Sequence, residues 1–299
     1  MEQLTRRPLT ATLAEAVSYL EDGMTLAIGG FNTASKPMAL VREIVRQGRR
    51  NLTVVATPSS IEVDLLIATG CAAKVIAPYV GAEALAPICP FYRAAVQQGT
   101  IEIREVDAGI VLTMLRAARQ GLPFLPWRGG VGTSLPALNP DLKIIEDPFG
   151  GEQLLAVPPV HPDLAILHAA QADAYGNVQH LGNPFADALI AAAARHTIVQ
   201  VERIVPNEVI RKAPELTTVL PIFVNAVVAA PYGAHPFFSQ RHYVIDRVHI
   251  REYLEAGHAY LAGNKGPFEE YLDRYVYGPR GHEDYLQAVG FERILSLQA

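Results

Sequence analysis

Residues 22–37, Asp22-Gly23-Met24-Thr25-Leu26-Ala27-Ile28-Gly29-Gly30-Phe31-Asn32-Thr33-Ala34-Ser35-Lys36-Pro37, contain a short apolar strand that runs directly into two glycines and a helix start. Because Gly29 and Gly30 have no Cβ, the main chain there can adopt a positive φ or pass close to a ligand. Pro37 suits the first turn of a helix, whose free N–H groups favour anions. The segment predicts a site for a phosphate or an acyl-CoA at a strand end. The alternative is a tight turn that binds nothing.

The rest of the chain alternates strand patterns with helix patterns. Thr12 and Glu15 have the spacing of a capping box before a first helix, which Gly23 ends. Strands are expected at 25–28, 52–56, 74–77, 101–106, 122–126, 142–146, 154–157, 164–169, 197–201 and 222–230, and helices at 38–47, 110–120 and 187–195. Continuous apolar runs of this kind are typical of strands buried in a parallel sheet. The sequence therefore predicts an α/β fold with an open, mostly parallel sheet and helices on both faces.

Two segments depart from this alternation. Residues 127–140 have no period around Gly130-Val131-Gly132, which predicts a loop longer than usual, and we expect it to be functional. After residue 240 tyrosines and charged helix formers become frequent. We therefore expect an α/β domain at 1–240 and a helical extension at 241–299 packed on it. The tyrosines of the extension suit either a cap over the sheet edge or a surface against a partner subunit.

Composition excludes several classes of function. The 299 residues are 50% hydrophobic and 18% charged, which is enough to bury a large core, and the net charge of -5 argues against a nucleic-acid surface. Cys71 and Cys89 are too few for a disulfide framework, and residues 1–20 lack the apolar core of a signal peptide, so we expect a cytoplasmic protein. The uncharged run at 216–234 contains prolines and a glycine, which predicts buried strand and no membrane span.

Histidines give no metal signal. His235 and His242 are the candidates, but the nine histidines show neither a His-x-x-x-His pair on a helix nor an acidic partner at ligand spacing. We predict no metal. The segment 56–60 follows a strand, and we expect it to face the same ligand cleft as Gly29 and Gly30, because ligands collect at the carboxyl ends of parallel strands.

The opening segment resembles the N-terminal signature of family I CoA-transferases, in which an acidic-Gly pair, an apolar strand and Gly-Gly-Phe precede Gly-x-Pro. Asp22-Gly23, the strand at 26–28, Gly29-Gly30-Phe31 and Pro37 match, while Ser35 stands where the family usually has glycine. Further matches follow in family order at 130–133, 152–155, 162–169 and 173–177. The ordered matches span two thirds to three quarters of the chain, which is similar to the α subunits of glutaconate and 3-oxoacid CoA-transferases.

This resemblance implies a transfer of CoA between an acyl-CoA thioester and a carboxylic acid, with no permanently bound cofactor. In the family a glutamate of the β half attacks the thioester, and the nucleophile motif is missing from this chain. The chain is thus expected to be an α subunit whose partner is a β subunit, without which it is inactive. The residues expected to contact CoA or substrate are Gly29, Gly30, Phe31, Asn32, Gly130, Val131 and Gly132. We also expect Gly30→Ala to lower activity while sparing the fold, except for a few tenths to about 1 kcal/mol of backbone effect.

A second branch of the superfamily is also similar. Residues 101–107, 122–126 and 200–205 resemble the α subunits of a hydrolase that opens the last steroid ring of cholesterol-derived CoA thioesters. There a glutamate matching Glu105 takes part in carbon–carbon bond cleavage. Asp107 lies on the same side of the expected strand, where a second carboxylate would raise the pKa of a general base.

Two other interpretations stay open. Glu105 can simply be solvated or paired with Arg104 or Arg116. The chain can also be a non-catalytic ligand-binding subunit on the same fold, since fold does not fix function.

Overall fold

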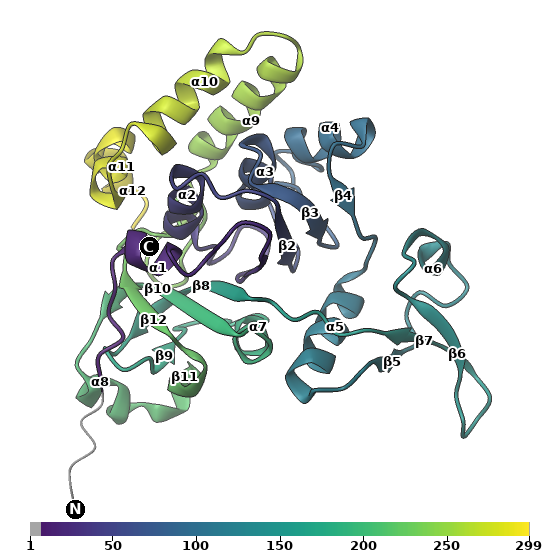
Figure 1. The fold of residues 1–299 in the computed structure, drawn as a ribbon. Coiled ribbons are helices and arrows are strands. Elements are labelled where there is room, and N and C mark those ends of the chain that lie inside the picture. The colour runs from purple at the N-terminus through teal and green to yellow at the C-terminus, as the bar shows by residue number, and fades with distance from the viewer. Residues whose placement is uncertain (1–6, 299) are drawn as a thin grey trace, which may run out of the picture.

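The computed structural model describes residues 7–298, and a nine-stranded sheet forms its centre (Figure 1). The strand order is β11-β9-β8-β1-β2-β3-β4, and β10 pairs with both β8 and β12. The strands are β1 (Thr25–Ile28), β2 (Leu52–Ala56), β3 (Ala72–Ile76), β4 (Glu102–Ile103), β8 (Leu164–Ala172), β9 (Val178–Gln179), β10 (His196–Ile204), β11 (Thr217–Val219) and β12 (Ala226–Ala229). All pairs are parallel except those made by β9. The predicted mostly parallel sheet is confirmed. We expected no signal peptide in residues 1–20, and the first six of these lie outside the described residues.

Two hydrophobic cores lie on opposite faces of this sheet. Because side chains alternate along a strand, Leu26 and Ile28 of β1 join one core and Ala27 joins the other. Helices α1 (Leu13–Val17), α2 (Met38–Arg46), α3 (Ile61–Ala68) and α4 (Pro90–Gln98) supply the first core, and α5 (Ala108–Gln120) and α7 (Asp187–Ala193) supply the second. The short helix α8 (Asn207–Lys212) follows β10. Helices on both faces were expected, and this prediction is confirmed.

A separate three-stranded sheet corrects part of the prediction. The strands β5 (Leu125–Trp127), β6 (Lys143–Glu146) and β7 (Gln153–Val157) pair antiparallel in the order β5-β7-β6, next to the short helix α6 (Leu135–Leu138), away from the main sheet. The turn between β6 and β7 is short, with the Asp147 amide donating to the Glu152 carbonyl at 2.7 Å. A short turn forces antiparallel pairing, since parallel strands need a crossover of a dozen residues or more.

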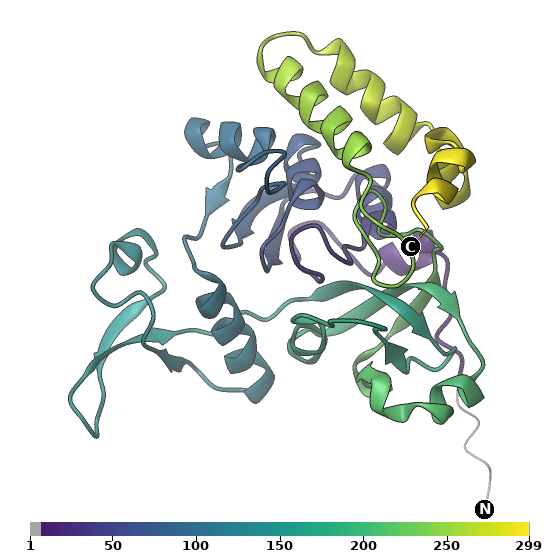
Figure 2. The same ribbon diagram turned by 180° about the vertical axis from the view of Figure 1, so that it is seen from behind.

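The C-terminal helices form an additional layer over α2, α3 and α4, as the reverse view shows (Figure 2). They are α9 (Arg247–Leu261), α10 (Gly266–Leu272), a π-helical turn (Asp273–Tyr277), α11 (His282–Val289) and α12 (Phe291–Ser296). Tyr253, Tyr271, Tyr275 and Tyr285 are buried within this layer. Because they are buried, these four side chains do not form a surface against a partner subunit, and the cap over the sheet edge stays a prediction. The domain boundary at residue 240 stays a prediction.

A buried ionic cluster attaches this layer to the α/β part. Arg293 donates two hydrogen bonds to the Asp246 carboxylate at 2.6 and 2.8 Å, and His235 contacts the same carboxylate at 3.1 Å. Burial acts to raise the pKa of Asp246, but the hydrogen bonds from His235 and Arg293 outweigh it and hold that pKa well below its usual range. The Arg42 guanidinium lies over the Tyr285 ring at 3.4 Å from its centroid. No helix within residues 7–298 has the length and apolarity that crossing a membrane requires.

Candidate active site

In the turn after β1 the glycines lie close to other backbone atoms of the chain, with no room for a Cβ on Gly30. Gly30 has φ +75°, and a Cβ added there would lie 2.5 Å from the carbonyl oxygens of Ala34 and Ser35. Its N–H donates to the Asp187 carboxylate at 2.8 Å, and the N–H of Gly29 donates to a β8 carbonyl at 2.9 Å. Close packing inside the protein therefore requires these glycines. A Cβ on Gly30 would clash with backbone atoms, so the structure argues against the expectation that Gly30→Ala spares the fold.

The first turn of α2 is closed to anions. The N–H groups of residues 38–40 donate to the Lys36 carbonyl at 2.8 Å, the Gly233 carbonyl at 2.9 Å and the Gln200 side-chain oxygen at 3.1 Å. The helix start is also buried. Because its donors are satisfied internally, the expected phosphate or acyl-CoA site at this helix terminus is wrong.

Ser35 keeps the backbone geometry of a glycine. It has φ +51° at the position where the CoA-transferase signature has glycine, and its amide donates to the Phe238 carbonyl at 2.9 Å. A left-handed conformation is costly for a residue with a Cβ. The departure from the signature therefore places a residue with a Cβ in a strained, left-handed conformation.

A cavity of about 770 Å³ opens where β1 and β2 end. Phe31 follows β1, and Thr57 and Pro58 follow β2, so both strand ends contribute to one cavity. Gly29 and Gly30 are not among its lining residues, so their place in a shared cleft with residues 56–60 stays a prediction. The Thr57 hydroxyl donates to the Gly30 carbonyl at 2.8 Å. Phe31 stacks on Phe185, with ring centroids 5.4 Å apart. The remaining lining residues are Ala108, Leu112, Arg116, Arg119, Gln120, Asn183, Ala186 and Leu189.

Charged side chains are buried next to the loop after β2. Lys36 and Glu62 form an ion pair of 3.0 Å with both side chains fully buried, and the Lys36 ammonium donates to the Pro58 carbonyl at 3.3 Å. Asp64, further along α3, accepts hydrogen bonds from the Tyr92 amide at 2.6 Å and the Tyr253 hydroxyl at 2.8 Å. Burial raises the pKa of Asp64 to about 7. These groups are buried, and Lys36 positions the cavity wall through its hydrogen bond to Pro58.

The glycine-rich loop lies at the junction of α5 and the second sheet. Gly130 and Gly132 have φ +88° and +79°, and a Cβ on Gly130 would lie 3.1 Å from Leu155 and 3.3 Å from Leu135. Neither they nor Val131 line the cavity in the described part of the chain. The structure therefore does not bring the two predicted groups of binding residues together, and the contact of 130–132 with CoA stays a prediction.

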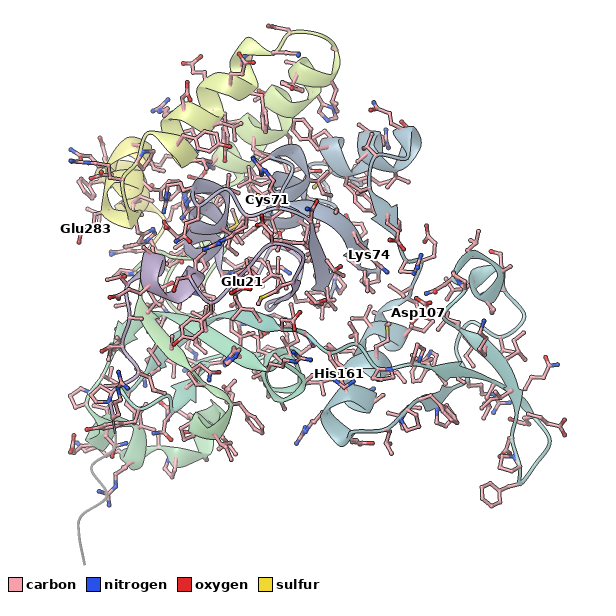
Figure 3. The ribbon with its side chains drawn as sticks, viewed as in Figure 1. Glu21, Cys71, Lys74, Asp107, His161 and Glu283 are labelled. Atoms are coloured by element: carbon pink, nitrogen blue, oxygen red, sulfur yellow. The ribbon has the colours of Figure 1, made fainter. Side chains whose placement is uncertain are left out.

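Glu105 is exposed between β4 and α5. Asp107, labelled in Figure 3, is the N-cap of α5: its carboxylate accepts a hydrogen bond from the Ile110 amide at 2.7 Å. Arg104 pairs with Glu102 and Asp141 instead of Glu105. The role of Glu105 stays a prediction.

The two candidate histidines differ in their surroundings. His235 is buried against Asp246 and Tyr285, while His242 lies near the surface beside the Gln240 carbonyl. In residues 7–298 no group of three His, Cys, Asp or Glu side chains is arranged to hold a metal ion.

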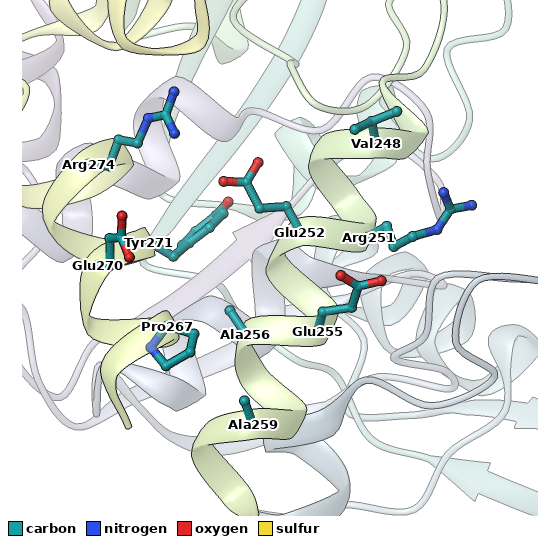
Figure 4. A pocket seen from close by; sticks show the side chains of 10 residues that line it. All are labelled: Val248, Arg251, Glu252, Glu255, Ala256, Ala259, Pro267, Glu270, Tyr271 and Arg274. Atoms are coloured by element: carbon teal, nitrogen blue, oxygen red, sulfur yellow. The ribbon is translucent and has the colours of Figure 1, made fainter. Parts of the chain in front are cut away.

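A cavity of about 550 Å³ between α9 and α10 differs in character (Figure 4). Its wall mixes acidic Glu252, Glu255 and Glu270 with basic Arg251 and Arg274. It belongs to the C-terminal helices, whereas the strand ends open into the cavity at Phe31. The latter is the candidate active site.

Sequence reasoning missed three features of this site: Asp187, which binds the glycine turn, Phe185, which stacks on Phe31, and the arginines of α5. Asp187 only opens an alanine-rich helix in the sequence, and its partner is 157 residues away. For the arginines of α5 there was one signal. Ala108, Leu112 and Arg116 are spaced four residues apart, which places them on a common face of a helix.

A family model described as Coenzyme A transferase matches residues 10–230. The chain belongs to the coenzyme A transferase family. One subunit of the glutaconate CoA-transferase of Acidaminococcus fermentans is 33% identical over 96% of this chain and 93% of its own length. A crystal structure of glutaconate coenzyme A-transferase from that organism has a TM-score of 0.92 at 31% identity, covering 97% of this chain and 96% of that chain. The resemblance to α subunits of CoA-transferases is confirmed.

Two other relatives show that similar chains differ in their named functions. The cholesterol ring-cleaving hydrolase IpdA subunit of Mycobacterium tuberculosis is 35% identical over 86% of this chain and 94% of its own length. An uncharacterized protein of Archaeoglobus fulgidus is 37% identical over 94% of this chain, and this chain spans 62% of that protein's length. Similar chains therefore include subunits of a hydrolase as well as subunits of CoA-transferases.

Proposed function

We propose that this chain is the α subunit of a heteromeric, cytoplasmic CoA-transferase that moves CoA between an acyl-CoA thioester and a carboxylic acid. The observation that carries the proposal is the match to glutaconate CoA-transferase over 97% of the chain at a TM-score of 0.92. The cavity at the ends of β1 and β2 supports it, because this edge of a parallel sheet is where ligands bind. CoA enters as a substrate thioester and no cofactor is held permanently.

The turn after β1 divides into scaffold and contact residues in this proposal. Gly29 and Gly30 shape the turn, and the exposed Phe31 contacts the thioester substrate at the cavity rim. Asn32 has φ +50°, donates from its side chain to Glu83 at 2.7 Å, and is not among the lining residues of the cavity, so its contact with CoA stays a prediction. Residues 130–132 contact CoA from the α5 side.

The nucleophilic glutamate comes from a β subunit in this proposal. Such a partner must cover the cavity, because a carboxylate attacks a thioester only when it is held close and partly desolvated. The second sheet offers an apolar surface for it: Phe149, 98% exposed at the tip of the β6–β7 hairpin, with Ile144 and Leu138 exposed nearby in the chain.

The first alternative is a subunit of a ring-cleaving hydrolase. It is favoured by the 35% identity to the IpdA subunit, and by the exposed Glu105 at the entry to α5. In a transferase Glu105→Ala and Glu105→Gln should change turnover only mildly. In a hydrolase both should lower ring opening by about 10²- to 10⁴-fold, since Glu105 would move a proton. A non-catalytic ligand-binding subunit is the second alternative.

Purifying the chain alone and with a co-expressed β subunit tests the proposal. The chain alone should transfer no CoA from several acyl-CoA donors to acetate, and the complex should do so. Turnover by the isolated chain above a heat-killed control contradicts the assignment to an α subunit. A stable monomer that captures no β chain favours the ligand-binding alternative.

A further inference from the structure

The candidate active site is positively charged in a chain whose net charge is -5. Arg116 and Arg119 of α5 line it, and among its lining residues within 7–298 there is neither Asp nor Glu. The cavity between α9 and α10, by contrast, has three glutamates in its wall. A cavity lined by one sign of charge concentrates ligands of the opposite sign.

One face of α5 lines the cavity, with apolar residues at one end of the helix and arginines at the other. Ala108, Leu112 and Arg116 follow each other at intervals of four residues, and Arg119 is one turn after Arg116, so all lie on the same face. The rise along a helix places Arg119 about 16 Å beyond Ala108 along the axis. Phe31 and Phe185 complete the apolar part. The geometry suits an elongated ligand that has an apolar body and an anionic end.

Both guanidinium groups are available to a ligand. Each side chain is exposed, and none of the ion pairs within residues 7–298 involves either arginine. Arg119 lies in the last turn of α5, where a cation also complements the helix dipole. Arg116 lies one turn earlier, which makes that effect weaker for it. The planar fork of arginine matches carboxylates and phosphates.

We infer that Arg116 and Arg119 bind an anionic group of the CoA thioester. That group is either a second carboxylate at the far end of the acyl chain or a phosphate of CoA. The inference rests on the proposed function, because it takes the cavity to be the thioester site. If the group is the far carboxylate, the pair also determines which acyl groups the enzyme accepts.

Arg116→Met and Arg119→Met in the complex with the β subunit test this inference, because Met keeps the alkyl length and removes the charge. Arg93→Met is the matched control, since it removes an exposed arginine from α4 outside the cavity. The probes are glutaryl-CoA, butyryl-CoA and the pantetheine thioesters of both acids. Dissociation constants from calorimetry without an acceptor acid are measured beside the KM of transfer.

Each cavity variant should weaken binding of glutaryl-CoA by about ten- to a hundred-fold, and Arg93→Met should leave it unchanged. If the arginines bind the far carboxylate, the loss persists with glutaryl-pantetheine and disappears with butyryl-CoA. If they bind a CoA phosphate, the loss persists with butyryl-CoA and disappears with both pantetheine thioesters. Either pattern supports the inference.

Two results overturn the inference: cavity variants that bind every probe like Arg93→Met, or variants that no longer assemble with the β subunit, which would assign the arginines to the subunit interface. If the cavity variants weaken binding but the wild-type complex transfers no CoA, the inference stands and the proposed function is rejected. If the wild-type complex transfers CoA but the cavity variants bind every probe normally, the proposed function stands and the inference is rejected.

Discussion

Replacing Gly30 by alanine tests whether the turn after β1 is set by packing inside the chain. The new Cβ would lie 2.5 Å from the carbonyl oxygens of Ala34 and Ser35, which belong to the backbone and cannot rotate away. The φ of +75° costs a residue with a Cβ about 1–2 kcal/mol, and overpacking adds roughly 1–3 kcal/mol. Reduced entropy of the unfolded chain offsets about 0.4–1 kcal/mol. We expect a net loss of about 3 kcal/mol in the free energy of unfolding.

Gly48→Ala separates the steric part of this loss from the conformational part. Gly48 has φ +66°, and no atom lies within 4 Å of a Cβ added there. It should therefore lose only about 0.5–1 kcal/mol. Urea unfolding followed by far-UV circular dichroism gives both values. Equal losses for Gly30→Ala and Gly48→Ala would refute the close packing of the turn.

Three further substitutions test other parts of the structure. Ser35→Gly should stabilise the protein by about 0.5–1 kcal/mol in urea unfolding, because glycine tolerates the φ of +51°, and a loss of stability would contradict this. Arg293→Met should cost about 2 kcal/mol by leaving buried Asp246 short of its cation, whereas Arg280→Met, at a 92% exposed side chain, should cost under about 0.5 kcal/mol; similar losses would argue against the buried cluster. Asp64→Asn should flatten the pH dependence of stability in thermal unfolding. The pKa of Asp64 is about 7 in the folded protein against a normal value of 3.8, so wild-type stability falls as pH rises between these values, by up to roughly 4 kcal/mol; parallel profiles for variant and wild type would contradict this.

The elements with local signals were predictable from the sequence. β1 and β2 lie where their apolar runs place them, and the capping box of Thr12 and Glu15 forms. Helix α3 was missed because Glu62 and Asp64 are buried on it among apolar residues, which removes the amphipathic period. Their partners, such as Lys36 and Tyr253, are remote in sequence.

The site was predictable only in part. The sequence predicted that the loop after β2 shares a cleft with Gly29 and Gly30, and the structure has Thr57, Pro58 and the neighbouring Phe31 at one cavity, because β1 and β2 are adjacent parallel strands. It did not show that Asp187 would take the Gly30 N–H, or that the Gln200 side chain would take one at the start of α2, since these partners are more than 150 residues away. Backbone N–H groups that the sequence predicted to be free for a ligand are therefore hydrogen-bonded to remote side chains.

The mass of each intact subunit, measured after incubation with an acyl-CoA donor, tests the central claim most directly. A CoA-transferase forms a covalent enzyme–CoA thioester on its nucleophilic glutamate. We expect a CoA adduct on the β chain that is lost on adding a carboxylic acid, with the mass of this chain unchanged. An adduct on this chain, or consumption of the thioester in water with no adduct on either chain, would contradict the assignment as the α subunit of a CoA-transferase.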